Sequence, residues 1–317
     1  MGLFQKKELT NEERLRKAAR KAGKDYGVIK AKSLGEKITL AIAFVFMMIW
    51  ALLLIYPLLW LVVMSFKGLI QYNVDMAMNQ SMNLPNPITW ENYPNALKHL
   101  EVRDVKLGGM LFNTVWYMVI TVVQSTFIHL CTGYVFAKYQ FRGRTFIYNF
   151  VIIAMIIPVF GTGGALFELW FNLGMYDNPL HVIVSNCAGF GMQFLVFMGF
   201  FKGISWEYAE AVLIDGGNDF TVFFKIMIPM AIPMIATMSI MRFIGAWNAY
   251  GEMIVYLPSY PTLATGIFYV QTTIGSRSGN YPEFFAAAII ATIPVLITFF
   301  FAAPTIMKNY TVGGLKG

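Results

Sequence analysis

The feature that constrains the fold most is a set of long runs without charged residues. From Ile38 to Phe66 there is no Asp, Glu, Lys or Arg, and this run is longer than the roughly 20 residues with which a helix crosses a bilayer. Only 13% of the residues are charged, against about 25% in an average soluble domain. We therefore expect an all-α membrane protein with six transmembrane helices. The six runs are 38–66, 111–137, 145–167, 178–201, 226–251 (interrupted by Arg242) and 284–307.

Lys and Arg are distributed unevenly between the two sides of such a bundle. Eighteen of the 24 fall in the first 37 residues, in the loops after the second and fourth runs, and in the tail, while five fall in the opposite loops. Because cytoplasmic loops carry an excess of Lys and Arg, both termini should be cytoplasmic. We thus expect a basic cytoplasmic segment at 1–37, a transmembrane domain at 38–310 and a cytoplasmic tail at 311–317.

Three polar regions outside the runs have their own expected roles. A helix at 9–22 in the basic segment either lies beside anionic membrane lipid or contacts a cytoplasmic partner. On the outer side, the loops 67–110 and 252–283 are long for plain connections, so a docking role for them is plausible. The first of these loops should contain an interfacial helix at 90–100.

Catalytic and metal-binding signatures are missing from the sequence. We find no phosphate-binding loop, no carboxylate pair in a polar cleft and no nucleophile elbow. The histidines His99, His129 and His181 lack the spacing of metal ligands, and both cysteines fall inside runs. No carboxylate lies in the middle of a run, which argues against proton or sodium coupling. The chain is therefore expected not to be an enzyme and to bind no metal, cofactor or nucleic acid.

The polar stretch EYAEAVLIDGGNDFTVFFKIMIP, at 207–229, predicts two short helices joined by a sharp turn. Ser205 can cap a first helix that runs to about Ile214, and Asp219 can cap the second. The turn Asp215-Gly216-Gly217-Asn218 lies between them, since Gly tolerates positive φ. A rigid cytoplasmic knob and a plain interfacial connector both fit these features. In the second helix one apolar face is expected, made by Phe220, Phe223, Phe224 and Met227.

The same stretch resembles the EAA motif of ABC-importer permeases, with Val212 and Gly217 in place of the usual alanines; Gly217 is expected to loosen the turn. The matching positions are Glu210, Ala211, Asp215, Gly216, Phe223, Ile226 and Pro229. Beyond the motif, the chain is similar to carbohydrate-importer permeases of the maltose-transporter type, except for its first 30 residues. The similar segments are YPLLWLVVMSFK, ITWENYPNAL, NTVWYMVITVV, YVFAKYQFRGR, GAWNAY and PTLATGIF.

This resemblance implies a type I ABC-importer permease fold in the bacterial inner (plasma) membrane. In that family the segment at about 204–229 is the coupling helix, which docks on a separate ATPase. Two ATPase subunits would use ATP and Mg²⁺, and a second homologous permease and an extracellular solute-binding protein would complete the importer. The alternatives are a channel or secondary carrier without an ATPase and, more weakly, a permease for amino acids or metals. The implied coupling residues are Glu207, Glu210, Ala211, Asp215, Gly216, Gly217 and Phe223.

Arg242 is the charged residue that interrupts the fifth run. It lies 13 residues beyond Pro229, about 20 Å along a helix and hence near mid-membrane, where an unpaired Arg costs at least ~2.5–3.5 kcal/mol. It either faces the translocation cavity and binds sugar hydroxyls or an acidic sugar group, or it pairs structurally with a partner's acid or with backbone carbonyls. His129 is likewise either a pathway residue or a hydrogen-bonded bundle residue. The further pathway candidates are Gln193, Trp247, Asn248 and Tyr250.

Overall fold

The computed structural model describes residues 34–157, 161–273 and 279–310. These fall into two units, the first ending at Trp60 and the second beginning at Leu61, and each is described by itself. The helix expected at 9–22 and the tail expected at 311–317 lie outside the described residues.

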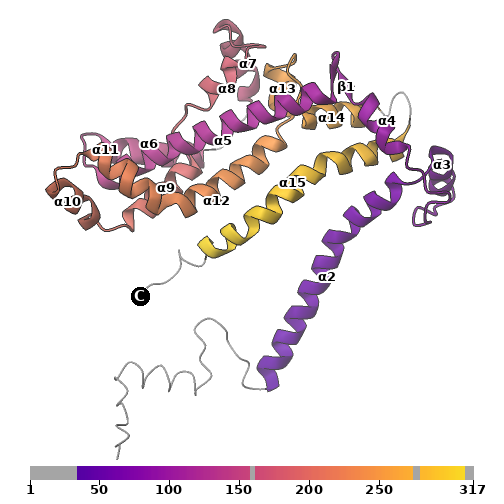
Figure 1. Cartoon of the computed structure of the whole chain (residues 1–317), viewed down its shortest axis with the longest axis horizontal. Coiled ribbons are helices and arrows are strands. Elements are labelled where there is room, and N and C mark those ends of the chain that lie inside the picture. Colours follow the sequence, from indigo (N-terminus) through magenta and orange to yellow (C-terminus); the bar gives the residue numbers. More distant parts are fainter. Residues whose placement is uncertain (1–33, 158–160, 274–278, 311–317) are drawn as a thin grey trace, which may run out of the picture. The chain divides into compact units, whose positions relative to one another are not determined.

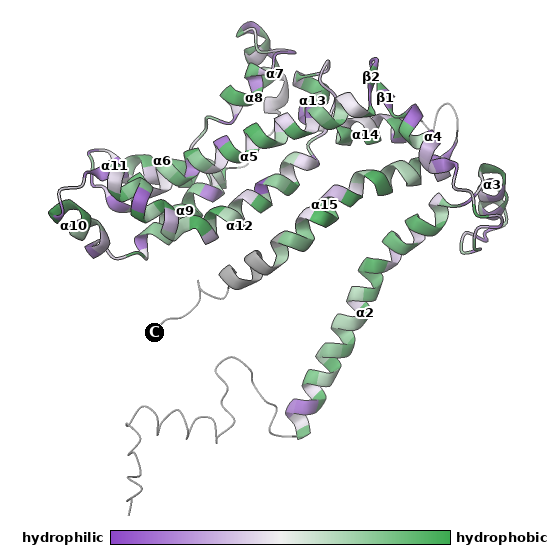
Figure 2. Cartoon of the chain, viewed as in Figure 1, coloured by the Kyte–Doolittle hydropathy of each residue, from purple (hydrophilic) through white to green (hydrophobic). Residues whose placement is uncertain are grey.

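The described part of the first unit is most of a single helix, α2 (Leu34–Ser65). This helix begins before residue 38, so the expected boundary between the cytoplasmic segment and the first span falls inside it. Its residues from Leu34 to Leu59 are exposed on every side, and Figure 2 shows them as almost uniformly hydrophobic. A helix that is apolar all round suits a lipid environment.

The second unit is mostly helical, and Figure 1 labels its elements. In chain order they are α3 (Leu69–Ala77), α4 (Asn92–His99), β1 (Glu101–Val102), β2 (Val105–Lys106), α5 (Leu107–Lys138), α6 (Arg144–Ile156), α7 (Thr162–Asn172), α8 (Leu180–Ser185), α9 (Met192–Lys202), α10 (Glu207–Ile214), α11 (Asp219–Val222), the π-helix η1 (Phe223–Met227), α12 (Ile228–Trp247), α13 (Gly251–Tyr256), α14 (Leu263–Thr273) and α15 (Tyr281–Tyr310).

The structure contains four helices, among the residues it describes, that are long and apolar enough to span a membrane. Two of the predicted runs are instead divided: 145–167 becomes α6 and α7, and 178–201 becomes α8 and α9. The expectation of one continuous helix in each of these two runs is therefore wrong. The four long helices are Leu34–Ser65, Leu107–Lys138, Asp219–Trp247 and Tyr281–Phe301.

The break between α8 and α9 has a clear tertiary cause. Gly189 lies so close to α5 that a Cβ there would be 2.7 Å from Thr132 Cγ2, and the Thr132 hydroxyl donates a hydrogen bond to the Gly189 carbonyl at 2.7 Å. A backbone carbonyl that leaves a helix needs such a partner in an apolar environment. Contact with α5 therefore stabilises a non-helical connection that the run's hydropathy does not indicate.

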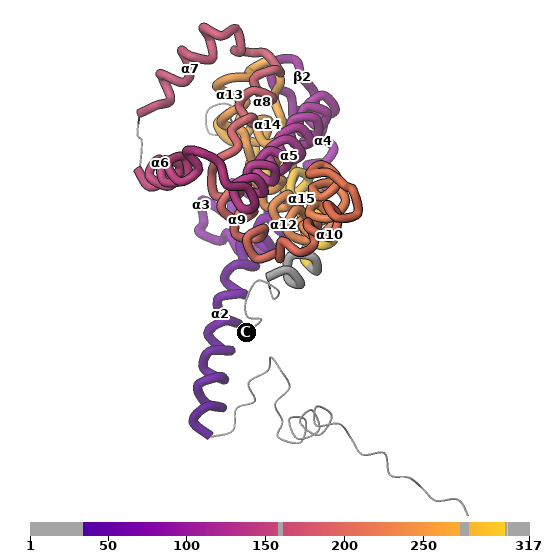
Figure 3. Tube along the Cα trace, turned by 90° about the vertical axis from the view of Figure 1, so that its left-hand side faces the viewer, coloured from indigo at the N-terminus to yellow at the C-terminus, as the bar shows by residue number. Residues whose placement is uncertain are grey.

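The helices α5, α9 and α12 pack together, and α12 also contacts α15; Figure 3, viewed from the α10 end, shows this grouping. The helices α10 and α11 lie at one end of the second unit, whereas α4, α14 and the β1–β2 hairpin lie at the other (Figure 1). A helix is present within the predicted range 90–100, as α4, while its position at the membrane interface stays a prediction.

The small hairpin is the one departure from the all-α expectation in the described residues. Val102 pairs with Val105 in antiparallel register, and the two residues between them, Arg103 and Asp104, both have positive φ, at 48° and 64°. Two consecutive positive φ values are those of the tight turn whose twist suits a hairpin. Neither residue is a glycine, so the sequence carries no strong signal for this turn.

Candidate functional site

The stretch 207–229 folds into the two short helices that its sequence predicts, α10 and α11. The cap position of α10 is Trp206 and not the expected Ser205, although the backbone N–H of Glu207 donates to Ser205 Oγ at 3.3 Å. The helix ends at Ile214 as expected. The second helix is capped by Asn218 and not by Asp219, because Asn218 Oδ1 accepts the Thr221 N–H at 2.9 Å. Asn218 has the extended backbone that a cap position requires, whereas Asp219 is already helical.

Two glycines make the turn between these helices, each for a different reason. Gly216 has φ at 82°, a conformation that glycine adopts without steric cost. At Gly217 a Cβ would lie only 2.5 Å from Val212 Cγ1 and 2.9 Å from the Val212 carbonyl oxygen. The Gly217 N–H also donates to that oxygen at 2.9 Å. The turn is therefore closely packed at Gly217, contrary to the expected loosening.

The predicted apolar face of the second helix is only partly correct. Phe223 and Met227 are buried, together with Val222, but Phe220 and Phe224 are 74% and 52% exposed. The backbone from Phe223 to Met227 is a π-helical turn, whose wider winding changes the register of the side chains. The buried stripe packs against α5, where the rings of Tyr134 and Phe223 are 4.7 Å apart.

The end of α5 fixes this segment at two points. Lys138 Nζ donates to the Ile204 carbonyl at 2.5 Å, just before α10, and Tyr139 Oη donates to Asp219 Oδ1 at 3.0 Å, at the start of α11. The ring of Tyr139 also meets the edge of Trp206. Burial, with the hydrogen bonds to Tyr134 and Asp219, raises the pKa of Tyr139, so its hydroxyl stays a donor. The segment is thus attached to α5 as well as to α12.

The exposed side of the segment carries both carboxylates and apolar side chains. The carboxylates of Glu207, Glu210 and Asp215 are exposed, and each is without a side-chain hydrogen bond or ion pair to any residue that the structure describes. Beside them Ile214 is 85% exposed. Tyr208, Leu213 and Phe220 are exposed as well, and apolar surface rimmed by polar residues is typical of an interaction surface. We call the exposed side of 207–220 the coupling surface, after the role that the sequence predicts for it. Of the predicted coupling residues, Phe223 is buried beneath this surface.

Three of the predicted pathway residues come together around one cavity of about 580 Å³. The cavity is partly open to the surface, since its lining residues Met192 and Met241 are exposed. We call it the arginine cavity. It lies between α5, α9, α12 and the connection from α8 to α9. Its lining residues are Ser125, His129, Ser185, Asn186, Ala188, Phe190, Met192, Gln193, Val196, Met238, Met241, Arg242 and Gly245.

Arg242 is held in this cavity by an amide and not by a carboxylate. Its Nη2 donates to Asn186 Oδ1 at 2.8 Å, and Asn186 Nδ2 in turn donates to the Val182 carbonyl at 2.8 Å. The Nε of Arg242 is buried without a partner. Neither a backbone carbonyl nor an acid pairs directly with Arg242 among the described residues. Asn186 was not a candidate from the sequence, because it is 56 residues away.

His129 and Gln193 are oriented by backbone carbonyls. His129 Nδ1 lies 2.6 Å from the Ser125 carbonyl oxygen, and since that oxygen can only accept, Nδ1 carries the hydrogen. The ring nitrogen Nε2 is left for the cavity side, near Gly191. Gln193 Nε2 donates to the Met238 carbonyl at 3.3 Å, which leaves its side-chain oxygen as an acceptor.

The other three pathway candidates belong to a different cavity, of about 810 Å³, between α12, α14 and α15. Trp247, Asn248 and Tyr250 line it, and the ring of Tyr250 stacks on Phe268 at 4.7 Å. At 3.6 residues per turn, Trp247 lies on the opposite side of α12 from Arg242. The structure therefore divides the six candidates between two sites.

A polar cluster at the first half of α5 was not predicted. Tyr117 Oη donates to Glu252 Oε2 at 2.7 Å, and the Nε2 of buried His181 lies 3.5 Å from Glu252 Oε1. Burial acts to raise the pKa of Glu252, but the contacts from His181 and Tyr117 lower it below its ordinary value. Its three members come from α5, α8 and α13, so no local spacing in the sequence could indicate the cluster.

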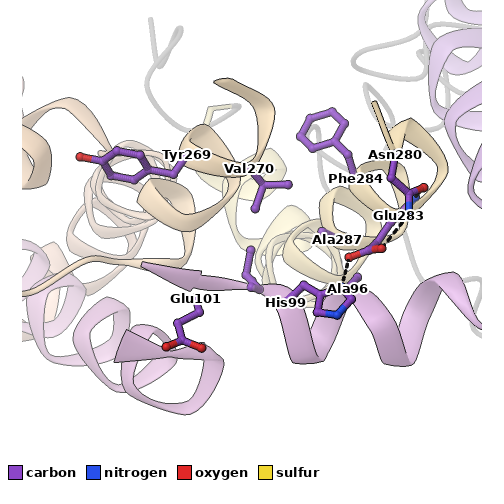
Figure 4. Close-up of a pocket in the computed structure, with 10 residues that line it drawn as sticks. Ala96, His99, Glu101, Tyr269, Val270, Asn280, Glu283, Phe284 and Ala287 are labelled. Carbon is purple, nitrogen blue, oxygen red and sulfur yellow. Dashed lines mark hydrogen bonds and ion pairs between the residues drawn. The ribbon is translucent and has the colours of Figure 1, made fainter. Parts of the chain in front are cut away.

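A further pocket, of about 480 Å³, is lined by residues from both of the long loops that were expected on the outer side (Figure 4). His99 on α4 and Glu283 on α15 face each other in it, with Nδ1 and Oε1 2.7 Å apart. Asn280 Nδ2 donates to the other oxygen of Glu283 at 2.8 Å. This pair ties α4 to the start of α15.

Comparison with known proteins identifies relatives that match most of this chain. The chain is 28% identical to a diacetylchitobiose uptake system permease protein of Streptomyces coelicolor, over 82% of this chain and 83% of that protein. It is similar to a chain of a bacterial ABC transporter involved in the import of the acidic polysaccharide alginate, with a TM-score of 0.70, 24% identity and coverage of 88% and 99%.

A second solved structure is a bacterial alginate ABC transporter in complex with a periplasmic protein that carries an alginate pentasaccharide. The TM-score is 0.60, the identity 16%, and the coverage 92% of this chain and 96% of that one. The relatives are transport permeases and not enzymes. The sequence model described as the binding-protein-dependent transport system inner membrane component matches residues 129–308. The resemblance seen in the sequence is thereby confirmed, and the chain belongs to this family of inner membrane transport components.

Proposed function

We propose that the chain is the permease subunit of an ATP-driven importer of oligosaccharides and forms half of its translocation pathway. The observation that carries the proposal is the coupling surface, a rigid helix–turn–helix with unpaired acids that is fixed to both α5 and α12. The relatives' named substrates, diacetylchitobiose and alginate, support a carbohydrate.

The proposed assembly contains this chain, a second homologous permease, two ATPase subunits that use ATP and Mg²⁺, and an extracellular solute-binding protein. The family description supports the binding protein. In this arrangement α2, α5, α6 with α7, α8 with α9, α12 and α15 make six passes through the inner membrane. Both termini and the coupling surface lie in the cytoplasm, and the loops 67–110 and 252–283 dock the binding protein outside.

Coupling would work through the contacts of the segment. Glu210 is exposed and has no pairing partner among the described residues, so a basic residue of the ATPase can pair with it. When the ATPase dimer closes, the coupling surface moves, and the bonds from Lys138 and Tyr139 transmit that movement to α5. Because α5 and α12 both line the arginine cavity, a change in their relative position opens or closes it.

The test is a charge reversal at Glu210. In Glu210→Lys, we expect the ATPase to be lost on co-purification and oligosaccharide uptake to stop, because a like charge then faces the partner's base. Glu168→Lys, on α7 at the proposed outer side, is the matched control and should keep both. Retention of the ATPase and of uptake in Glu210→Lys would favour a channel or secondary carrier instead.

We further propose that the imported sugar passes the arginine cavity, where Arg242, His129 and Gln193 contact it. The cavity at Trp247, Asn248 and Tyr250 is a second candidate contact region. In Arg242→Ala, uptake should fall while the complex still assembles. Normal uptake by a normally assembled complex would exclude the role of Arg242.

A further inference from the structure

We propose that the arginine cavity binds an anionic group of the imported oligosaccharide, and that this group is the carboxylate of a uronic acid unit. The inference rests on the proposed function and names its substrate class. It is argued from the charge, the free donors and the shape of the cavity.

The cavity carries one formal charge, and that charge is positive. Arg242 is the sole Asp, Glu, Lys or Arg among the residues that line it, and the lining otherwise consists of neutral polar and apolar side chains. Arg242 is half-buried, and a cation beside the low-dielectric protein attracts an anion more strongly than it would in bulk solvent. A neutral sugar would leave this charge uncompensated.

The nearest carboxylate of the chain does not take this role. Glu252 receives the Tyr117 hydroxyl on one oxygen and faces His181 with the other, and it does not line the cavity. The direct partner of Arg242 is the neutral amide of Asn186. Arg242 and Glu252 influence each other at a distance, but the described residues form no ion pair at Arg242.

The guanidinium of Arg242 has N–H groups that make no hydrogen bond to the described residues. Of its five N–H groups, one is used in the bond to Asn186, and the buried Nε cannot be reached by a ligand. The remaining terminal N–H groups form the planar edge that matches the two oxygens of a carboxylate. Because Asn186 is itself bonded to the Val182 carbonyl, its amide holds the guanidinium in place; Asn186 is thus a positioning residue.

The rest of the lining suits a sugar ring. His129 Nε2 and the Gln193 side-chain oxygen can bond hydroxyl groups, while Phe190, Met238 and Met241 offer apolar surface to the C–H face of the ring. The volume of about 580 Å³ lies within the ~300–1,000 Å³ of typical small-molecule sites. Charge on one wall and apolar surface on another together fit a uronate better than a free inorganic anion.

The experiment uses proteoliposomes that contain the complete transporter, with its own binding protein added. The probes are a labelled uronate oligosaccharide, its carboxyl-reduced neutral counterpart and a sulfated neutral oligosaccharide of the same length. The variants are Arg242→Gln and Arg242→Lys, with Ile244→Leu, on α12 but outside the cavity lining, as a control. Co-purification of the other subunits and basal ATPase activity report whether each variant assembles.

We expect the wild type to import the uronate probe in preference to its reduced counterpart and to the sulfated one. Arg242→Gln should lower uronate uptake about tenfold or more, because a charge-assisted hydrogen bond is lost. Arg242→Lys should fall in between, and Ile244→Leu should stay near wild type. Uptake of the neutral counterpart should not fall in Arg242→Gln.

Three results would overturn the assignment. They are wild-type uptake of the neutral or the sulfated probe in preference to the uronate, an equal loss of all probes in Arg242→Gln, and a loss of subunit assembly in that variant, which would place Arg242 in a structural pair. In the first case the importer function stands and only the substrate class fails. If the wild type imports no probe and retains no ATPase, the proposed function fails with it.

Discussion

Replacing Gly217 by alanine tests how tightly the turn of the coupling surface is packed. The new methyl group would lie 2.5 Å from Val212 Cγ1 and 2.9 Å from the Val212 carbonyl oxygen, whereas carbon atoms in good contact are about 3.5–4.0 Å apart. Unlike Gly216, Gly217 is not a residue of positive φ, so the cost is steric. Overpacking of this size costs about 1–3 kcal/mol.

The overlap with the carbonyl oxygen requires a shift of the backbone between α10 and α11, since Val212 is part of α10. Gly217→Ala should therefore lower the fraction of transporter that keeps its ATPase on purification and reduce the coupling of ATP hydrolysis to uptake. Adding Val212→Ala removes the contact with Cγ1 but leaves the contact with the carbonyl, so the double variant should recover in part.

Gly199→Ala is the matched control, because nothing lies within 4 Å of a Cβ at that position on α9; it should behave as the wild type. Titration of detergent-solubilised permease with the purified ATPase measures the effect directly. Wild-type affinity in Gly217→Ala, or no improvement in the double variant, would refute the steric reasoning.

Two further predictions concern polar contacts of this fold. Lys67 is fully buried and bonds Asp75 at 2.6 Å. The hydrogen bonds from Lys67 and Asn83 lower the pKa of Asp75. The stabilisation of the fold by this pair is therefore complete above the ordinary Asp pKa and is lost as the pH falls through the lowered pKa of Asp75. Asp75→Asn should lower the thermal unfolding temperature in detergent at pH 7 and make little difference in strong acid, and an equal deficit at both would contradict the pair's role. Tyr139→Phe removes the hydrogen bond to Asp219. It should lower the unfolding free energy by about 0.5–1.5 kcal/mol and weaken the coupling of ATP hydrolysis to uptake. An unchanged unfolding free energy and unchanged coupling would contradict the role of this hydrogen bond in holding the segment to α5.

Local features of the fold could be predicted from the sequence, and features that depend on distant contacts could not. The long apolar helices and the helix–turn–helix of the coupling surface follow from hydropathy, capping residues and glycine placement, all within a few positions. The break before α9 depends on Thr132, which meets Gly189 across 57 residues. The cap at Asn218 was missed because Asn and Asp are almost equally good caps, and the backbone decides between them.

In the candidate site, too, contacts between distant residues could not be predicted, whereas the placement of residues around one helix could. Arg242 could be recognised as an intramembrane charge, but its partner Asn186 comes from a different part of the chain and carries no signal of its own. The separation of Arg242 from Trp247 follows from helical geometry alone, since five residues of an α-helix turn through more than one full rotation and end on another face. That spacing was available in the sequence.

The most direct test of the central claim is a cross-link from the coupling surface to the ATPase in intact membranes. Ile214, at the end of α10, is 85% exposed, and Leu84, in the loop expected outside, is 73% exposed. After Cys131 and Cys187 are replaced by serine, a cysteine-reactive photo-cross-linker is attached to Ile214→Cys or to Leu84→Cys. The account predicts an adduct with the ATPase subunit from Ile214→Cys and none from Leu84→Cys; an ATPase adduct from neither position, in a complex that still imports oligosaccharide, would contradict it.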